Sequence, residues 1–216
     1  MKSLRKQAFY DNLVFEVFEE VYEPAEDTFL LADYLAQVVE ETDTVLDMGT
    51  GCGILAVIAA MKALKVVATD LNPHAVECAR LNIKTNNVSG KVDVRQGDLF
   101  KPLQKTEKFD LIIFNAPYLP SEPHEEKTWK GRAWAGGQSG REVIDRFIDE
   151  APQYLKDGGR ILLAQSTLAS IEKTVTKFSK AGSEASVVAE KKFPFETIVI
   201  IEAKAFIPRK QKRGIR

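Results

Sequence analysis

The sequence predicts an α/β fold, in which a seven-stranded, mostly parallel sheet has helices on both faces and an antiparallel last strand. Apolar runs of strand length alternate with helix-length segments from residue 44 to residue 180. This alternation is typical of a parallel sheet built from strand–helix–strand units. Two further apolar runs, at 186–189 and 197–202, have only a short connection, so they are predicted to be antiparallel neighbours.

The composition limits the class of protein. With 216 residues, the chain is long enough for one α/β domain with a full core. Its 30 Lys and Arg balance 31 Asp and Glu, so its body offers no general attraction to nucleic acid. Cys52 and Cys78 lack the spacing of a zinc site or a disulfide framework, which favours a reducing compartment. No stretch resembles a signal peptide or a membrane span, so we expect a soluble, cytoplasmic protein.

We expect three segments: an N-terminal extension over 1–20, a main domain over 21–207 and a basic C-terminal tail over 208–216. Residues 1–12 have little pattern and are predicted to be mobile or loosely docked, whereas 14–18 could form a short strand or a cover for a pocket. Five of the last eight residues are basic. They indicate either a solvated tail or a weak, salt-sensitive contact with RNA or the ribosome.

The first half of the chain alternates helices with strands. Glu26, Asp27 and Thr28 supply the acids and the hydroxyl that suit a helix N-terminus, and apolar residues follow at helical spacing. Asn72 is predicted to cap a later helix that has Pro73 at its first position. These patterns predict helix 26–39, strand 45–46, a buried helix 54–64, strand 65–68, helix 73–84 and strand 92–94.

The second half begins with a strand at 109–114, followed by a stretch without periodicity at 115–138. A loop of this length in a compact domain is usually functional or disordered. The Ser-Gly-Arg-Glu motif at 139–142 has the pattern of a capping box and predicts a helix that is disturbed at Pro152. The remaining predicted elements are strand 161–164, helix 168–180, and the two closing strands at 186–189 and 197–202.

A glycine-rich turn follows the strand at 45–46. Gly49, Gly51 and Gly53 allow a tight turn that leads directly into a helix N-terminus, where free N–H groups favour negative charge. Asp70, at the end of the next strand, is placed to accept both hydroxyls of a ribose. The turn therefore predicts a nucleoside site. The structural alternative is a plain strand-to-helix turn, with Asp70 as a cap.

The spacing of this turn favours S-adenosylmethionine over NAD. A dinucleotide loop has the pattern G-x-G-x-x-G, whereas this loop is D-x-G-x-G-x-G, with Asp47 as its acid. A carboxylate beside a pyrophosphate would be repelled, but beside the ammonium of an amino-acid moiety it would be attracted, directly or through water.

A second group of polar residues follows the strand at 109–114. The amide oxygen of Asn115 and the backbone carbonyl oxygen of Ala116 can each accept a hydrogen bond from an NH2 group. Pro117 stiffens the turn and Tyr118 can stack on a flat group. Together they predict a site that holds a planar amine or amide with its nitrogen aimed at a methyl group on sulfonium. The structural alternative is an Asn-Pro turn that caps the strand.

Both motifs resemble those of known enzymes. The glycine loop resembles motif I of the class I methyltransferases, whose Rossmann-like seven-stranded fold matches the predicted sheet. The residues at 115–118 resemble the N-P-P-[YF] motif of methyltransferases that act on planar nitrogens, except that Ala116 replaces the first proline. This change loosens the turn slightly, but the backbone acceptor is retained.

Two longer stretches narrow the resemblance. Val-Tyr-Glu-Pro-Ala-Glu-Asp-Thr-Phe-Leu-Leu at 21–31 and Trp-Ala-Gly-Gly-Gln-Ser-Gly-Arg-Glu-Val-Ile-Asp-Arg-Phe at 134–147 resemble the eukaryotic and archaeal HemK-related subfamily. The resemblance covers residues 20–204. Members of this subfamily methylate the side-chain amide (N5) of the glutamine in the Gly-Gly-Gln motif of class I peptide chain release factors, and so act in translation termination.

Neither His74 nor His124 has a ligand set around it, so no metal is expected. The resemblance implies a set of site residues. The cofactor would contact Thr28, Asp47, Gly49, Gly51, Gly53, Asp70, Leu71, Asp98, Leu99 and Asn115. The substrate would contact Asn115, Ala116, Pro117 and Tyr118, of which Asn115, Pro117 and Tyr118 are the predicted catalytic residues. Two alternatives stay open: Thr28 as an ordinary helix cap, and Asp98 as a turn residue bonded to backbone.

The family enzyme is often paired with a small zinc-binding activator subunit that adds a strand to the sheet. Residues 91–95 are predicted to form such an edge, although Lys91, Asp93 and Arg95 could equally blunt an edge that needs no partner. Competing functions are N-methylation of an adenine or guanine amine in RNA or DNA, lysine methylation of a protein, and a catalytically idle cofactor-binding scaffold.

Overall fold

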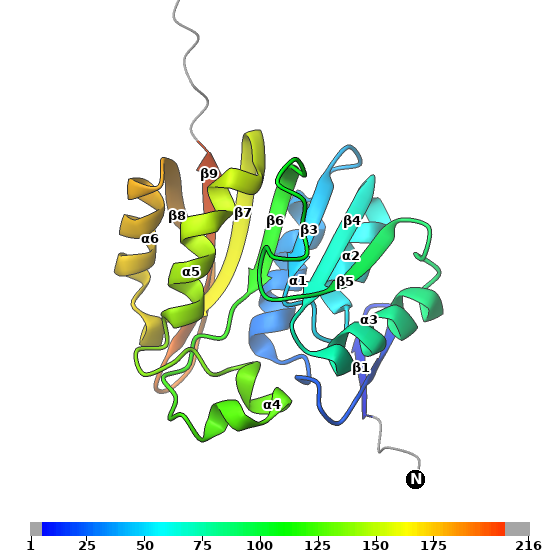
Figure 1. Cartoon of the computed structure of the whole chain (residues 1–216), viewed down its shortest axis with the longest axis horizontal. Coiled ribbons are helices and arrows are strands. Elements are labelled where there is room, and N and C mark those ends of the chain that lie inside the picture. The colour runs from blue at the N-terminus through cyan, green and yellow to red at the C-terminus, as the bar shows by residue number, and fades with distance from the viewer. Residues whose placement is uncertain (1–5, 206–216) are drawn as a thin grey trace, which may run out of the picture.

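The computed structural model describes residues 6–205, so the predicted basic tail at 208–216 lies outside the described residues. Its main sheet has the strand order β5-β4-β3-β6-β7-β9-β8 (Figure 1). β9 is antiparallel to both of its neighbours, while the other pairs are parallel, which confirms the predicted fold class. The strands are β3 (Thr44–Met48), β4 (Lys65–Asp70), β5 (Val92–Gln96), β6 (Phe109–Asn115), β7 (Leu155–Ser166), β8 (Ser183–Lys192) and β9 (Thr197–Ala205).

Helices cover both faces of this sheet. Alternate strand residues point to opposite faces, so Val45 packs in one apolar layer and Leu46 in the other. α1, α2 and α3 pack in the layer of Val45, whereas α5 and α6, in front of the sheet in Figure 1, pack in the layer of Leu46. The helices are α1 (Glu26–Val38), α2 (Ile54–Lys62), α3 (Pro73–Thr85), α4 (Trp129–Arg132), α5 (Glu142–Glu150) and α6 (Ile171–Lys180), with 3-10 turns η1 (Glu125–Lys127), η2 (Ala151–Tyr154) and η3 (Thr167–Ala169).

The predicted capping box at 139–142 is wrong, because α5 begins at Glu142 with Arg141 at its N-cap. Gly137 and Gly140 both have positive φ and fold the preceding residues into a turn of their own. In that turn the Glu142 N–H donates to the Gly136 carbonyl, 3.0 Å away, so it does not bond to the Ser139 side chain. Two glycines thus override the local capping pattern.

Two other element boundaries also differ from the prediction. The helix predicted at 168–180 is divided at Ser170, whose φ of 57° ends η3 before α6 begins. The buried Arg141 guanidinium stabilises this break, because it donates to the carbonyls of Ala169 and Ser170. The strand predicted at 161–164 extends over the whole of β7, which includes Gly158 with φ 75° and a register shift against β6.

The N-terminal extension is more ordered than predicted. Residues 6–17 form an antiparallel hairpin of β1 (Lys6–Tyr10) and β2 (Leu13–Val17), where a mobile or loosely docked segment was expected for 1–12. Asn82 of α3 fixes this hairpin: its amide accepts from Glu16 N (2.8 Å) and donates to Glu16 O (2.7 Å) and Cys52 O (2.8 Å). One buried side chain therefore joins the hairpin, α3 and the glycine loop.

Among the described residues, no helix combines the length and the apolar character that crossing a bilayer requires.

We predict that Asn82→Ala lowers the free energy of unfolding by about 2–3 kcal/mol, because it removes the side-chain partner of the Glu16 N–H and of the buried Cys52 carbonyl. Chemical denaturation measures this change. Asn86→Ala is the matched comparison, since Asn86 contacts Val14 of the same hairpin in the same way (Val14 N at 3.4 Å and Val14 O at 3.0 Å) but is only half-buried, so its loss should be smaller. Equal losses in the two variants would contradict the prediction.

Candidate active site

The two predicted motifs meet at the carboxyl ends of neighbouring strands. β3 and β6 pair in parallel, with Met48 opposite Phe114, so the glycine loop and residues 115–118 leave the sheet side by side. A cavity of about 550 Å³ lies between them. Predicted site residues that line it are Thr28, Gly49, Gly51, Asp70, Leu71, Asp98, Leu99, Asn115, Ala116, Pro117 and Tyr118.

The glycine loop needs its glycines for two different reasons. All three have positive φ: 63° at Gly49, 57° at Gly51 and 87° at Gly53. Gly53 lies outside the cavity lining, and a Cβ there would come within 3.0 Å of the Ala79 Cα on α3. Gly53 therefore permits the close approach of α2 to α3, whereas Gly49 and Gly51 shape the wall of the cavity.

Asp47 is enclosed beneath this loop and does not line the cavity itself. Its side chain is fully buried, and the Thr50 hydroxyl donates to its Oδ2 at 2.5 Å. Among the described residues, its Oδ1 has no hydrogen-bond partner. Burial raises the pKa of Asp47 to about 7, against the lowering effect of the Thr50 bond. A cation in the cavity would therefore favour the ionised form of this carboxyl.

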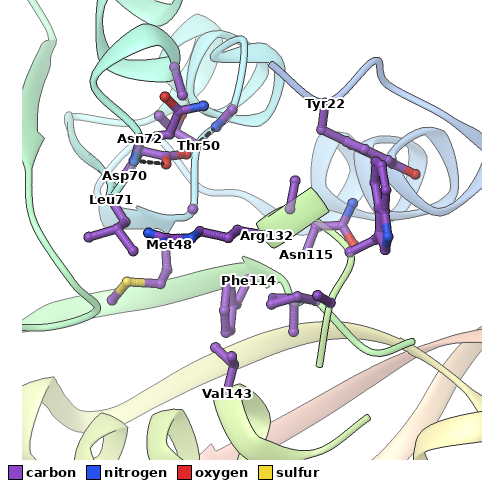
Figure 2. Close-up of a pocket in the computed structure, with 18 of the residues that line it drawn as sticks. Tyr22, Met48, Thr50, Asp70, Leu71, Asn72, Phe114, Asn115, Arg132 and Val143 are labelled. Atoms are coloured by element: carbon purple, nitrogen blue, oxygen red, sulfur yellow. Dashed lines mark hydrogen bonds between the residues drawn. The ribbon is translucent and has the colours of Figure 1, made fainter. Parts of the chain in front are cut away.

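Asp70 occupies the end of β4, on the wall opposite Asn115 (Figure 2). Its Oδ2 accepts from Gly51 N at 2.9 Å and its Oδ1 from Asn72 N at 2.8 Å. Burial raises the pKa of Asp70, although these backbone bonds favour the charged form. The two bonds fix the plane of the carboxylate, and each oxygen keeps acceptor capacity for a hydroxyl group in the cavity.

The Asp98 side chain forms ion pairs that the sequence did not predict. Its Oδ2 forms ion pairs with Lys101 (2.8 Å) and with Arg146 of α5 (2.7 Å). Although partial burial raises its pKa, these two cations bring the pKa of Asp98 below its usual value. Asp98 and Leu99 still line the cavity, so their predicted contact with an adenine remains a prediction.

Asn115 presents an unused acceptor at the cavity. Its Nδ2 donates to the Thr28 hydroxyl on α1 at 3.1 Å. Its Oδ1 is buried and has no hydrogen-bond partner among the described residues. Leaving a buried carbonyl oxygen unpaired costs about 1–3 kcal/mol, so a hydrogen-bond donor that enters the cavity would be stabilised there.

The Tyr118 ring is anchored through its hydroxyl, which donates to Asp27 Oδ2 at 3.1 Å. Burial raises the pKa of Tyr118, and the nearby charge of Asp27 adds to this. Tyr22 also reaches Asp27, at 3.4 Å. The Tyr118 ring still forms part of the cavity wall, together with Tyr22.

Several lining residues were not predicted. Arg132 of α4 extends across the cavity toward Met48 and Leu71 in Figure 2, and its guanidinium lies 4.9 Å from the centre of the Trp129 ring. Two backbone bonds hold residues 134–136 beside Leu119 at the cavity: Leu119 N donates to Trp134 O, and Gly136 N donates to Leu119 O. The absence of periodicity in this segment indicated a functional or a disordered loop, and nothing in the sequence pattern singled out Arg132. The other unpredicted lining side chains include Tyr22, Asp27, Trp134, Val143 and Arg146.

The sheet order and this cavity at the carboxyl ends of β3, β4 and β6 define a Rossmann-like methyltransferase. The chain belongs to the methyltransferase small domain family, whose model matches residues 26–195. This finding confirms that the protein is an enzyme of the methyltransferase class.

The sequence is similar to those of HemK-related enzymes, which confirms the predicted resemblance. A putative protein N5-glutamine methyltransferase of Methanocaldococcus jannaschii is 40% identical over 195 residues, covering 89% of this chain and 96% of the relative. Methyltransferase HEMK2 of Homo sapiens is 34% identical over 194 residues, covering 86% and 90%. A solved structure that is also similar is the E. cuniculi Mtq2–Trm112 complex, described as responsible for the methylation of the eRF1 translation termination factor. One chain of that complex matches with a TM-score of 0.70 and 28% sequence identity. The match covers 87% of this chain and 99% of that one.

The raised pKa of Asp47 predicts a pH-dependent stability. Between the usual pKa of 3.8 and a native pKa of about 7, the folded protein binds a proton that the unfolded chain has lost. The contribution of Asp47 to the free energy of unfolding therefore falls as pH rises through this range. In denaturation measured from pH 4 to pH 7, Asp47→Asn should remove that part of the slope. Identical slopes for wild type and variant would show that Asp47 titrates normally.

Proposed function

We propose that the protein transfers the methyl group of S-adenosylmethionine to the side-chain amide nitrogen (N5) of the glutamine in the Gly-Gly-Gln motif of a class I peptide chain release factor. The observation that carries this proposal is the buried Oδ1 of Asn115 beside the cavity, which has no hydrogen-bond partner within residues 6–205. An acceptor in that position suits a neutral NH2 group. The names of the similar proteins supply the substrate class. A release factor as substrate would place the enzyme in the cytoplasm.

The residues around the glycine loop fit the cofactor. The fixed carboxylate of Asp70 would accept the ribose hydroxyls, and Asp47 would attract the ammonium of the methionine moiety, directly or through water. Thr28 would close the cavity from the side of α1. Leu71, Asp98 and Leu99 would surround the adenine. When bound, S-adenosylmethionine supplies an electrophilic methyl group on sulfonium.

The residues at 115–118 would hold the target amide. Asn115 Oδ1 and the Ala116 carbonyl would accept its two N–H bonds, which shifts electron density onto the nitrogen and favours the geometry of attack. Pro117 restricts the turn, and the Tyr118 ring would flank the flat amide. The product proton leaves to water after transfer, so the reaction needs no dedicated base. Positioning and fixed acceptors would supply most of the rate enhancement.

We expect Asn115→Ala to lower the rate of methyl transfer by about a hundredfold or more, because it removes an acceptor that is fixed before reaction. Cofactor affinity, measured by calorimetry, should change only a few fold. The assay uses labelled S-adenosylmethionine with a release factor, with its Gln-to-Ala variant, or with RNA and DNA. Label on the wild-type factor alone is the expected outcome.

Asn86→Ala is the matched enzyme control, because Asn86 lies at the end of α3 and does not line the cavity. Label on nucleic acid would instead support methylation of a base amine, and label on the Gln-to-Ala factor would support lysine methylation. Normal turnover by Asn115→Ala would show that Asn115 has no catalytic role.

We also propose that a small zinc-binding activator subunit pairs with β5. β5 is an edge of the main sheet, and the Mtq2 protein of similar structure forms a complex with Trm112. Val66 N donates to Lys91 O, and Gly97 N donates to Asp70 O. The backbone N–H and C=O groups of the odd-numbered residues of β5 therefore point toward β4. The backbone groups of Val92 and Val94 therefore face outward. Exposed Leu64, at the end of α2, adds apolar surface near this edge.

Val94→Pro should weaken the complex with such a subunit by at least about tenfold, because it removes an outward N–H and no bond to β4. Pull-down and calorimetry with the purified subunit measure this loss. Asp93→Pro is the matched comparison: it removes a bond within the sheet, so it should also lower the stability of the enzyme alone. Undiminished binding by Val94→Pro would rule out strand pairing at β5.

A further inference from the structure

Both ends of the predicted catalytic motif are attached to the first turn of α1. At one end, Asn115 Nδ2 donates to Thr28 Oγ1 at 3.1 Å. At the other end, the Tyr118 hydroxyl donates to Asp27 Oδ2 at 3.1 Å. Asp27 and Thr28 are consecutive residues and each is only 4% exposed; the bond of Tyr118 to Asp27 is buried and that of Asn115 to Thr28 is part-buried. The two attachments restrict the whole turn from Asn115 to Tyr118.

The hydrogen bonds of Thr28 determine which way the Asn115 amide points. The single hydroxyl proton of Thr28 is donated to Asp27 Oδ1, 3.1 Å away. Its lone pairs accept from Asn115 Nδ2 and from the Ala25 N–H. The hydroxyl is then fully used. If the amide were flipped, Asn115 Oδ1 would face an oxygen that has no proton left to offer.

Asp27 sets the direction of this series of bonds. An ionised carboxylate has no proton, so it can only accept. Its Oδ1 accepts from the backbone N–H of Thr28 at 2.6 Å as well as from the Thr28 hydroxyl. Because the last member of the series can only accept, every member before it must donate toward Asp27. The Nδ2 of Asn115 is thereby turned toward Thr28 of α1, and its Oδ1 lies on the other side of the amide group, away from Thr28.

We propose that Asp27 and Thr28 are positioning residues, which keep the Asn115 carbonyl oxygen directed at the target NH2 group and hold the Tyr118 ring in place. This inference rests on the proposed function. It gives Thr28 a task distinct from contact with the cofactor, and it assigns a role to Asp27, which sequence patterns indicated only as an acid at a helix N-terminus. Neither residue takes part in bond making, since both act through Asn115 and Tyr118.

Thr28→Val tests the proposal because valine keeps the shape of threonine and removes the hydroxyl. We expect kcat for the release factor to fall about tenfold, as the loss of one buried hydrogen bond implies, with cofactor affinity unchanged within about twofold. Thr28→Ser should restore kcat. Thr44→Val, on β3 outside the cavity lining, is the matched control and should keep wild-type kcat and wild-type stability within error.

Two further readouts separate positioning from a merely structural role. Asp27→Ala and Thr28→Val should be non-additive, so that the double variant is no slower than Asp27→Ala alone. In protein labelled with ¹⁵N-asparagine, the side-chain amide signal of Asn115, identified by its loss in Asn115→Ala, should shift in Thr28→Val and return in Thr28→Ser. The amide signal requires no substrate, so it tests the inference even if the wild-type enzyme does not methylate the release factor.

The kinetic and spectroscopic results of these variants either support or overturn the positioning role of Asp27 and Thr28. A fall in kcat that serine reverses, together with the shifted amide signal, supports the proposal. A loss of cofactor affinity with kcat unchanged would assign Thr28 to cofactor binding and overturn it. Additive effects of the two substitutions, or an Asn115 amide signal that is the same in Thr28→Val and in wild type, would also overturn it. Absence of transfer by the wild-type enzyme would contradict the proposed function alone.

Discussion

The site depends on the parallel pairing of β3 with β6. Because Met48 lies opposite Phe114, the glycine loop that follows one strand and the Asn-Ala-Pro-Tyr turn that follows the other leave the sheet as neighbours. The proposed reaction needs that adjacency, because the nucleoside cofactor is assigned to one loop and the planar nitrogen of the substrate to the other. A different strand order would separate the two motifs and leave each as an ordinary turn.

Three carboxyl groups lie around the two neighbouring loops and supply hydrogen-bond acceptors at or beneath the cavity wall. Asp70 is held by two backbone N–H groups, Asp47 lies under the loop with a raised pKa, and Asp27 orders the bonds that reach Asn115. A neutral amide suits the Asn115 side of this cavity, whereas a positively charged moiety suits the Asp47 side. The side of the cavity beside Asp47 and Asn115 therefore suits a sulfonium donor and an amide acceptor, while Arg132 and Arg146 line other parts of the wall.

Much of this arrangement could be predicted from the sequence, because it follows from local patterns. Alternating apolar runs gave the order of strands and helices, and Asn72 with Pro73 marked the start of α3. The start of α5 was missed, since Gly137 and Gly140 form a turn that no capping pattern describes. The bond of Asp27 to Tyr118 and the place of Arg132 in the cavity wall were also missed, because each depends on how segments outside its own helix fold around it.

The central claim is that an amide NH2 and a methyl donor meet at the carboxyl ends of β3 and β6. Tandem mass spectrometry of a release factor after reaction with the enzyme and S-adenosylmethionine tests it most directly, since it locates the added methyl group on a single side chain. The account predicts one methyl group on the side chain of the Gly-Gly-Gln glutamine. A methyl group on a lysine, or an unmodified factor beside a methylated nucleic acid, would contradict it.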